Sequence, residues 1–333
     1  MPEVSVIVAV YNCEAYIEQC ISSISGQTAR DLEIVVADDG STDGTPAILE
    51  RLAQLDNRIR VYSRPNSGYA GVARNLGITH ARGRYIAFLD ADDLYHPKRI
   101  EKALSVFQKY PDVDIVFHDH KLFRSQHQQD ESSGFLEQTR FMLRAAEYLK
   151  EIEHDLYLCR EDFYSFISVD FIPFHTSSMM FPKELLSANG PWFREDIYPG
   201  EDGDLWLRLT QRRRVAFANE VLSYYRQWPG GISRDRARHL VTSITIHTEN
   251  LERGKAVFSE PEIRRYRAKI AQQLFELGYQ LVSENDMRES RTAYKRSMNL
   301  RFGMDTLAAY LKTFAPERIV RRYRYHARQA GEA

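Results

Sequence analysis

Cysteine is scarce in this 333-residue chain. The three cysteines are Cys13, Cys20 and Cys159, and no two of them have the CxxC spacing of zinc or redox sites. A small, odd number of cysteines also argues against a disulfide framework. We therefore expect a protein of a reducing compartment.

Long apolar runs are missing as well. No window approaches the ~18 uninterrupted apolar residues that a transmembrane helix needs. The N-terminus leads directly into a strand pattern, without the basic and apolar regions of a signal peptide. We expect neither kind of segment, and a cytoplasmic protein that can touch the inner face of the membrane peripherally.

The chain also lacks an excess of charge of one sign, because its formal net charge is −1. That excludes a uniformly basic nucleic-acid binder, so we expect no nucleic-acid partner. Charge is nevertheless unevenly distributed. Residues 234–333 hold 20 Lys and Arg against 12 Asp and Glu, a net charge of +8, which leaves −9 for residues 1–233. This asymmetry predicts two parts with different surfaces, divided after residue 233.

The first part has the pattern of alternating strands and helices. Short, continuous apolar runs at residues 4–10, 32–37, 59–62 and 85–89 predict buried strands, with helices between them. This alternation is typical of a parallel sheet in an α/β domain. Further along we expect a helix over 141–152 and a strand over 174–181. After residue 234 only helices are predicted.

Carboxylates follow these strands. Asp38 and Asp39 end the second apolar run, and Asp90-Ala91-Asp92-Asp93 directly follows another. Open α/β sheets bind their ligands at this end of the strands. Crowded carboxylates repel one another, and a divalent cation such as Mg²⁺ or Mn²⁺ relieves that repulsion. The alternative is a solvated acidic turn in which Asp93 caps the next helix.

Four motifs occur in a familiar order. They are the run from Val4 to Asn12, the run from Val36 to Thr45, Arg74-Asn75 leading to Asp90–Asp93, and Glu201-Asp202. Their order and spacing resemble those of the family 2 glycosyltransferases over about residues 4–230.

The resemblance implies a GT-A fold, in which a mostly parallel central sheet is flanked by helices, here with an α-helical C-terminal extension. It implies a nucleotide-binding half at about 1–118 and an acceptor half at 119–233. The separate helical region predicted from the residue pattern follows at 234–333. The implied reaction moves a sugar, with inversion, from a nucleotide-diphosphate sugar to an acceptor hydroxyl. We favour a UDP-sugar donor and a glycan or glycolipid acceptor in surface polysaccharide or lipopolysaccharide assembly.

The resemblance also assigns roles. Asp202 would be the general base, with Glu201 beside it as a like-charge neighbour, and Asp92 would hold a Mn²⁺ or Mg²⁺ ion on the diphosphate. The implied nucleotide-sugar-binding residues are Ala9, Val10, Tyr11, Asn12, Asp39, Arg74, Asp90, Ala91 and Asp92. On the acceptor side we expect His175 and Trp228, and Arg226 as a phosphate contact because Trp228 stands where relatives often carry histidine. A second copy of the chain is a further candidate partner.

Two other interpretations stay open at this point. A nucleotidyltransferase also places carboxylates around a metal, although it usually begins with a glycine-rich, basic phosphate loop. A non-catalytic interaction protein could be built on a degenerate transferase domain. Each motif also has a structural reading, since Asp39 can cap a turn and Glu201 and Asp202 suit the first turn of a helix.

Overall fold

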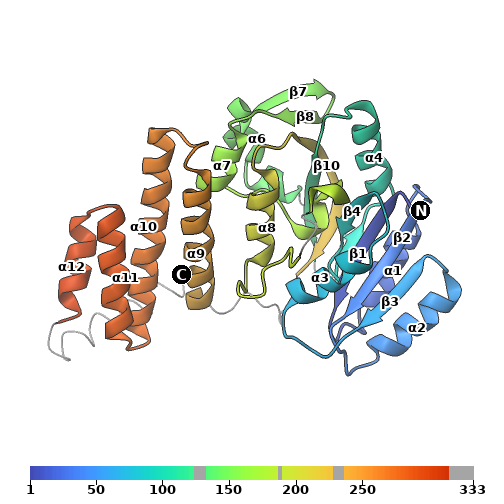
Figure 1. Cartoon of the computed structure of the whole chain (residues 1–333), viewed down its shortest axis with the longest axis horizontal. Helices are drawn as coiled ribbons and strands as arrows, with labels where there is room; N and C mark the ends of the chain where they lie inside the picture. The colour runs from blue at the N-terminus through green and yellow to red at the C-terminus, as the bar shows by residue number, and fades with distance from the viewer. Residues whose placement is uncertain (124–132, 187–189, 228–235, 315–333) are drawn as a thin grey trace. The chain divides into compact units, whose positions relative to one another are not determined.

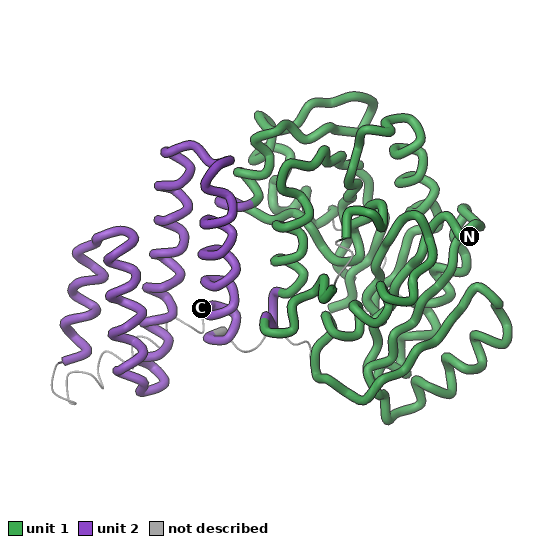
Figure 2. The backbone as a smooth tube through the Cα atoms, in the orientation of Figure 1, with its two compact units in different colours: residues 1–167, 171–196, 201–231 green, residues 168–170, 197–200, 232–333 purple. Residues whose placement is uncertain are grey.

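The computed structural model describes residues 1–123, 133–186, 190–227 and 236–314 (Figure 1). The chain forms two compact units, coloured separately in Figure 2. Unit 1 comprises residues 1–167, 171–196 and 201–231, and unit 2 comprises 168–170, 197–200 and 232–333. The division predicted after residue 233 falls outside the described residues and stays a prediction.

A ten-stranded sheet forms the centre of unit 1, in the order β3-β2-β1-β4-β9-β6-β10-β8-β7, with β5 paired to β10. Strands β3, β2, β1 and β4 are parallel, as are β6 and β10, while β9 joins these two parts by antiparallel pairing. The strands are β1 Val4–Val10, β2 Leu32–Asp38, β3 Ile59–Ser63, β4 Tyr85–Phe88, β5 Leu94–Tyr95, β6 Ile115–Phe123, β7 Leu149–Glu153, β8 Leu156–Cys159, β9 Met180–Pro182 and β10 Val215–Arg226.

Helices cover both faces of this sheet. The helices of unit 1 are α1 Ile17–Ser25, α2 Thr45–Leu55, α3 Ala70–His80, α4 Arg99–Lys109, α5 Phe135–Gln138, α6 Phe141–Arg144, α7 Phe163–Val169 and α8 Glu201–Thr210, with 3-10 turns η1 Ala146–Tyr148, η2 Thr176–Ser178 and η3 Lys183–Leu185. Alternate residues of β1, such as Val6 and Val8, share a buried cluster with α1, α2 and α4. Ile7 points to the other face, where it meets Gly77 of α3.

Two predicted elements differ from the structure. The helix expected over 141–152 ends at Arg144, and Leu149 begins β7 because it pairs with Cys159 of β8. The strand expected over 174–181 is reduced to β9. The residues before β9 form η2 because the Ser178 hydroxyl accepts a hydrogen bond from the His175 amide and donates one to its carbonyl.

Unit 2 contains four helices in its described part: α9 Arg236–Gly254, α10 Glu260–Ser283, α11 Met287–Leu300 and α12 Met304–Lys312. Helices α10 and α11 are antiparallel. The Ser290 hydroxyl donates to the Gly278 carbonyl at 2.8 Å, and the Ser297 hydroxyl donates to the Ala271 carbonyl at 2.7 Å. The Tyr294 ring lies against Gly278, where a Cβ atom would come within 2.7 Å of the ring. A glycine here lets the two helices approach closely.

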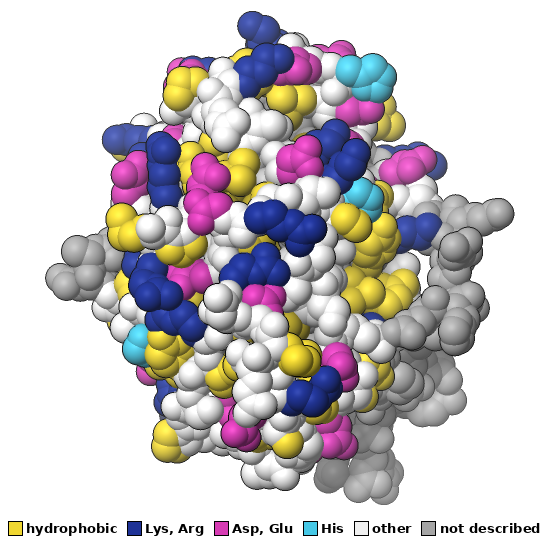
Figure 3. Space-filling view, turned by 90° about the vertical axis from the view of Figure 1, so that its right-hand side faces the viewer, with side chains coloured by type: hydrophobic (Ala, Val, Ile, Leu, Met, Phe, Trp, Pro, Cys, Tyr) yellow, Lys and Arg dark blue, Asp and Glu magenta, His cyan; other side chains and the backbone are white. Residues whose placement is uncertain are grey.

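Charged groups of both signs are interspersed on the face of the molecule shown in Figure 3. No helix in the described ranges is both long enough and apolar enough to span a bilayer.

We predict that Gly77→Ala destabilises unit 1. A Cβ atom at position 77 would overlap the Cγ2 atom of the fully buried Ile7 and lie 3.5 Å from its Cβ. Such overpacking costs about 1–3 kcal/mol. Hydrogen exchange of β1 amides, followed by mass spectrometry, measures the loss as a lower opening free energy. Gly203→Ala in α8 is the matched control, because nothing lies within 4 Å of its added Cβ. Equal protection in both variants would contradict the prediction.

Candidate active site

The ends of β1 and β2 form one group of the predicted site residues. Ala9 is partly buried and Val10 fully buried, whereas Tyr11 is 51% exposed. Asn12 has a positive φ of 45°, and its side-chain oxygen accepts a hydrogen bond from the Thr42 amide at 2.7 Å. The turn after β1 is therefore held to the loop that follows β2.

Asp39 belongs to the same group and is buried. Its carboxylate accepts hydrogen bonds from the Ser67 amide at 3.0 Å, the Ser67 hydroxyl at 2.9 Å and the Gly68 amide at 3.2 Å. The Arg64 guanidinium lies 3.4 Å away. Gly40 follows with φ of +77°, and a Cβ atom there would come within 2.7 Å of the Asn66 amide nitrogen. Asp39 thus fixes a loop that borders the strand ends, as well as being a candidate contact for a base.

Arg74 connects the second group. It lies on α3, which approaches α8 closely because Gly71 has no side chain; a Cβ there would be 2.9 Å from Glu201 Cγ. One guanidinium nitrogen is 2.8 Å from an Asp90 carboxylate oxygen, and another is 3.0 Å from Glu201 Oε1. The guanidinium also lies over the Phe193 ring. A buried arginine therefore bridges the acidic loop after β4 and the start of α8.

This bridge determines how the two carboxylates ionise. Burial opposes the charge on Arg74, but Asp90 and then Glu201 hold the Arg74 pKa above its ordinary value. Burial also opposes the charge on Asp90, and Arg74 together with His175 outweighs it, so the Asp90 pKa lies below its usual range. For Glu201, burial and the neighbouring Asp202 outweigh Arg74 and raise the Glu201 pKa.

The 3-10 turn η2 forms a second connection between the same two segments. The Ser177 hydroxyl donates to Asp93 at 2.8 Å and accepts from the Asp90 amide at 3.3 Å. The Thr176 hydroxyl donates to Asp202 Oδ2 at 3.2 Å. One short turn thus holds both the acidic loop and the predicted base. Neither Ser177 nor Thr176 was assigned a role from the sequence, although hydroxyls beside His175 were visible there.

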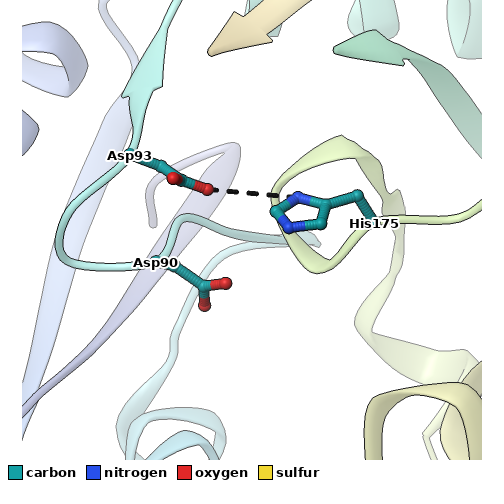
Figure 4. A group of neighbouring side chains, drawn as sticks. All are labelled: Asp90, Asp93 and His175. Carbon is teal, nitrogen blue, oxygen red and sulfur yellow. Dashed lines mark ion pairs between the residues drawn. The ribbon is translucent and has the colours of Figure 1, made fainter. Parts of the chain in front are cut away.

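Asp90, Asp93 and His175 together form a candidate cation site (Figure 4). One ligand atom from each lies within 4.8 Å of the others. Asp93 is fully buried, and its pKa is raised well above the usual range by burial and by repulsion from Asp90 and Asp92. Burial also lowers the His175 pKa, which leaves the imidazole neutral and able to ligate. A cation would offset the crowded negative charge, so the donor set fits Mn²⁺ or Mg²⁺.

Asp92, the predicted metal ligand, is not a member of this three-residue group, and its role stays a prediction. Ala91 is buried beside it. The His175 ring packs against His120 and Tyr225, with ring centroids 4.8 Å away in each case. His175 therefore faces the acidic loop as well as an aromatic wall, a position that its sequence neighbourhood did not indicate.

Arg226, expected to contact phosphate, is hydrogen-bonded to the acidic loop. Its Nε donates to the Asp92 carbonyl at 2.8 Å, and its backbone amide donates to Asp93 at 3.0 Å. The guanidinium lies between the rings of Tyr16 and Phe123, at 4.3 and 4.4 Å. It is 4% exposed. Phosphate contact by Arg226 remains a prediction, and Trp228 lies outside the described residues.

Comparison with known proteins gives a consistent set of likenesses. The family model "Glycosyl transferase family 2" matches residues 5–159. EpsJ of Bacillus subtilis (strain 168), named a glycosyltransferase, is 32% identical over 237 residues, which cover 70% of this chain and 63% of EpsJ. A chondroitin synthase of Pasteurella multocida (strain Pm70) is 40% identical over 117 residues, which cover 35% of this chain but 12% of that enzyme. The chain thus spans less than two thirds of these relatives.

Solved structures extend the likeness to the fold. Residues 1–349 of TarS from S. aureus have a TM-score of 0.62 at 18% identity, covering 98% of this chain and 92% of that one. The mannosyltransferase PcManGT of Pyrobaculum calidifontis, solved with GDP-Man and Mn²⁺, has a TM-score of 0.56 at 19% identity, covering 98% and 86%. TarS has also been solved with UDP, at a TM-score of 0.56, 19% identity and coverages of 99% and 87%. The predicted GT-A fold with its C-terminal helices is confirmed.

We predict that Arg74→Met lowers the free energy of unfolding of unit 1 by about 3–5 kcal/mol, because it leaves the buried Glu201 and the partly buried Asp90 without their counter-ion. Adding Glu201→Gln should recover part of the loss. Hydrogen exchange of β4 amides measures the effect. Arg51→Met is the control, since its 2.8 Å pair with Glu18 is half exposed and should change stability by less than about 1 kcal/mol. Equal losses for Arg74→Met and Arg51→Met would refute the bridge.

Proposed function

Because residues 5–159 of this chain match the model of glycosyl transferase family 2, we propose that the protein transfers a sugar from a nucleotide-diphosphate donor to an acceptor hydroxyl, with inversion at the anomeric carbon. Inversion in one displacement needs a base on the acceptor side and charge stabilisation on the opposite, leaving-group side. The candidate site contains groups suited to both tasks.

The observation that carries this proposal is the double connection between the acidic loop and the start of α8. Arg74 ties Asp90 to Glu201, and η2 ties Asp93 to Asp202 through the Ser177 and Thr176 hydroxyls. A base and a diphosphate site that are held to each other in this way keep a constant separation. Positioning of that kind is a large part of catalysis when two substrates must meet in line.

In the proposed mechanism Asp202 accepts the proton of the acceptor hydroxyl as the oxygen attacks. The Thr176 hydroxyl, 3.2 Å from Asp202 Oδ2, orients the carboxylate. Glu201 cannot rotate freely toward the acceptor because Arg74 holds its Oε1 at 3.0 Å. We therefore assign the proton transfer to Asp202 and a positioning role to Glu201.

A bound divalent cation would neutralise the negative charge that develops on the leaving diphosphate. We propose that Asp92 holds this ion on the substrate side, and that Asp90, Asp93 and His175 form its protein-side surroundings. PcManGT, which shares the fold, was solved with Mn²⁺. Burial and the neighbouring Asp90 and Asp92 raise the Asp93 pKa, and a cation would relieve this crowding by taking the place of the Asp93 proton.

For the donor we propose a UDP-sugar, held at the ends of β1 and β2. Tyr11 is exposed beside Asn12 and the Asp39 loop, where an aromatic ring can stack on a base. Ala9, Val10 and Ala91 would line the same region. TarS with UDP and PcManGT with GDP-Man show that related folds accept either base, so the preference for uridine rests on the resemblance of the motifs.

For the acceptor we propose a glycan or glycolipid of surface polysaccharide or lipopolysaccharide assembly, used at the cytoplasmic face of the membrane. His175 precedes Thr176, whose hydroxyl contacts Asp202, and its ring packs against that of Tyr225; both rings are partly exposed, and such rings pack well against sugar faces. The basic residues after 234 would favour contact with an anionic membrane, and a second copy of the chain is a further candidate partner.

Two alternatives can be separated from this proposal. A nucleotidyltransferase would join a nucleotide to its substrate and release pyrophosphate, whereas a glycosyltransferase releases a nucleoside diphosphate. A non-catalytic interaction protein would bind a nucleotide without turning over its sugar. Analysis of the products formed from a donor sugar therefore discriminates all three.

We predict that Asp202→Asn lowers kcat about 10²–10⁴-fold, because it removes the general base. Donor binding, measured as the thermal shift caused by nucleotide sugar, should be retained. Asp196→Asn is the control: that aspartate is exposed and paired with Arg194, and its loss should leave kcat unchanged. Full activity of Asp202→Asn would exclude this residue as the base.

Cation binding provides a separate prediction. Free Mn²⁺, counted by electron paramagnetic resonance in the presence of UDP, should rise when Asp92→Asn or His175→Gln weakens the site, and chelation should remove the stabilisation that UDP-sugars give. UDP-, GDP- and dTDP-sugars are compared in the same thermal-shift assay to identify the base. Asp112→Asn, an exposed residue paired with Arg214, is the control. Mn²⁺ affinity unchanged in both test variants would exclude this cation site.

A further inference from the structure

A basic pocket lies entirely on unit 2, on helices that the proposed reaction does not use. Its cavity of about 580 Å³ is lined by Pro261, Arg264, Arg265, Arg267, Ala268, Leu300 and Arg301. Four of these seven residues are arginines and none is acidic. We call this set of residues the arginine pocket. Nothing in the resemblance to family 2 assigns it a role.

The packing of α10 against α11 explains why these arginines meet. In the two hydrogen bonds between the helices, Ser290 faces Gly278 and Ser297 faces Ala271. Moving seven residues along α11 thus corresponds to moving seven residues back along α10. One further turn carries Arg301, at the end of α11, to the α10 turn that contains Arg267. The arginines are therefore placed by the regular antiparallel packing of two helices.

The charges of this pocket are mostly uncompensated. Arg265 is paired with Asp170. Arg264, Arg267 and Arg301 are exposed, and no carboxylate within the described ranges forms an ion pair with them. Three like charges around one cavity repel one another, and a polyanion would relieve that repulsion. The planar guanidinium group with its fork of donors suits phosphate oxygens in particular.

Exposed apolar side chains follow the pocket residue Arg301 in the sequence, and they indicate which kind of phosphate compound the pocket binds. Phe302 and Met304 directly follow Arg301 and are 64% and 70% exposed. A small soluble phosphate would leave these side chains in water. A phospholipid supplies both a phosphate for the arginines and an apolar layer for the neighbouring side chains.

We propose that the arginine pocket binds the phosphate of an anionic lipid headgroup and so docks unit 2 on a membrane surface, with Phe302 and Met304 entering the headgroup layer. The proposal does not rest on the transferase activity, since none of these residues belongs to the candidate active site. It gives the expected peripheral membrane contact a defined location on described residues.

The test compares two double variants of the full chain that lose the same charge. Arg264→Gln/Arg267→Gln removes two pocket arginines. Arg288→Gln/Arg296→Gln removes two exposed arginines of α11 that do not line the pocket. Each is sedimented with vesicles of phosphatidylcholine alone and with added phosphatidylglycerol, at 0.15 M salt. Unchanged circular dichroism and unchanged hydrogen exchange of the β1 amides verify that both variants are folded and that unit 1 is intact.

We expect the wild-type chain to bind the anionic vesicles and not the neutral ones. The pocket variant should bind about 30-fold more weakly, the effect of two arginines at an anionic surface. The α11 control should change binding about threefold or less, because salt screens charges more than about 8 Å from the surface. Phe302→Ser/Met304→Ser should weaken vesicle binding while leaving the affinity for inorganic pyrophosphate unchanged.

Three results would overturn the proposal. Absence of binding to the anionic vesicles would exclude the lipid. Equal losses in the two arginine variants would show general charge attraction without a pocket. Binding of pyrophosphate that depends on Arg264 and Arg267, without vesicle binding, would assign the pocket to a soluble phosphate compound instead.

Discussion

The buried guanidinium of Arg74 is the interaction on which the candidate site depends. It holds Asp90 and Glu201, two carboxylates far apart in the sequence, at 2.8 and 3.0 Å. A buried charge is strongly unfavourable unless it is paired and hydrogen-bonded. If either carboxylate segment moved away from α3, the Arg74 guanidinium would lose an ion-pair partner while still buried. The close approach itself needs Gly71 and Gly77, which bring α3 against Glu201 and against Ile7 of β1.

Charge compensation extends from this bridge through the acidic loop. Asp90 is compensated by Arg74, whereas fully buried Asp93 receives two neutral donors, the Ser177 hydroxyl and the Arg226 amide. Neutral donors do not cancel a charge, which is why burial keeps the Asp93 pKa high. Arg226 directs its guanidinium to backbone and to aromatic rings instead. The loop therefore holds a carboxyl group whose proton a cation would displace, at the place where a diphosphate and its cation would bind.

The sequence predicted those parts of the site that follow from local pattern. Apolar runs located β1, β2 and β4, and the carboxylates at their ends were found because strand ends in parallel sheets converge. The strand expected over 174–181 was wrong at its start, since hydroxyl bonds within 175–178 compete with strand pairing. The proximity of His175 to Asp93, and of Thr176 to Asp202, arises from packing between distant segments. No spacing in one sequence encodes such a contact.

The location of uncompensated charge also depends on packing between distant segments and not on local sequence pattern. The sequence shows −9 before residue 234 and +8 after it, but a sum does not say where charge is uncompensated. In unit 1 the loop after β4 brings carboxylates together, and Arg74 and η2 hold them in place. In unit 2, antiparallel packing of α10 and α11 gathers Arg264, Arg267 and Arg301, which form no ion pair with a carboxylate of the described residues. An anionic surface attracts the second feature and repels the first. The charge distribution alone therefore favours membrane contact through unit 2, with the acidic loop of unit 1 left for a cation-bound substrate.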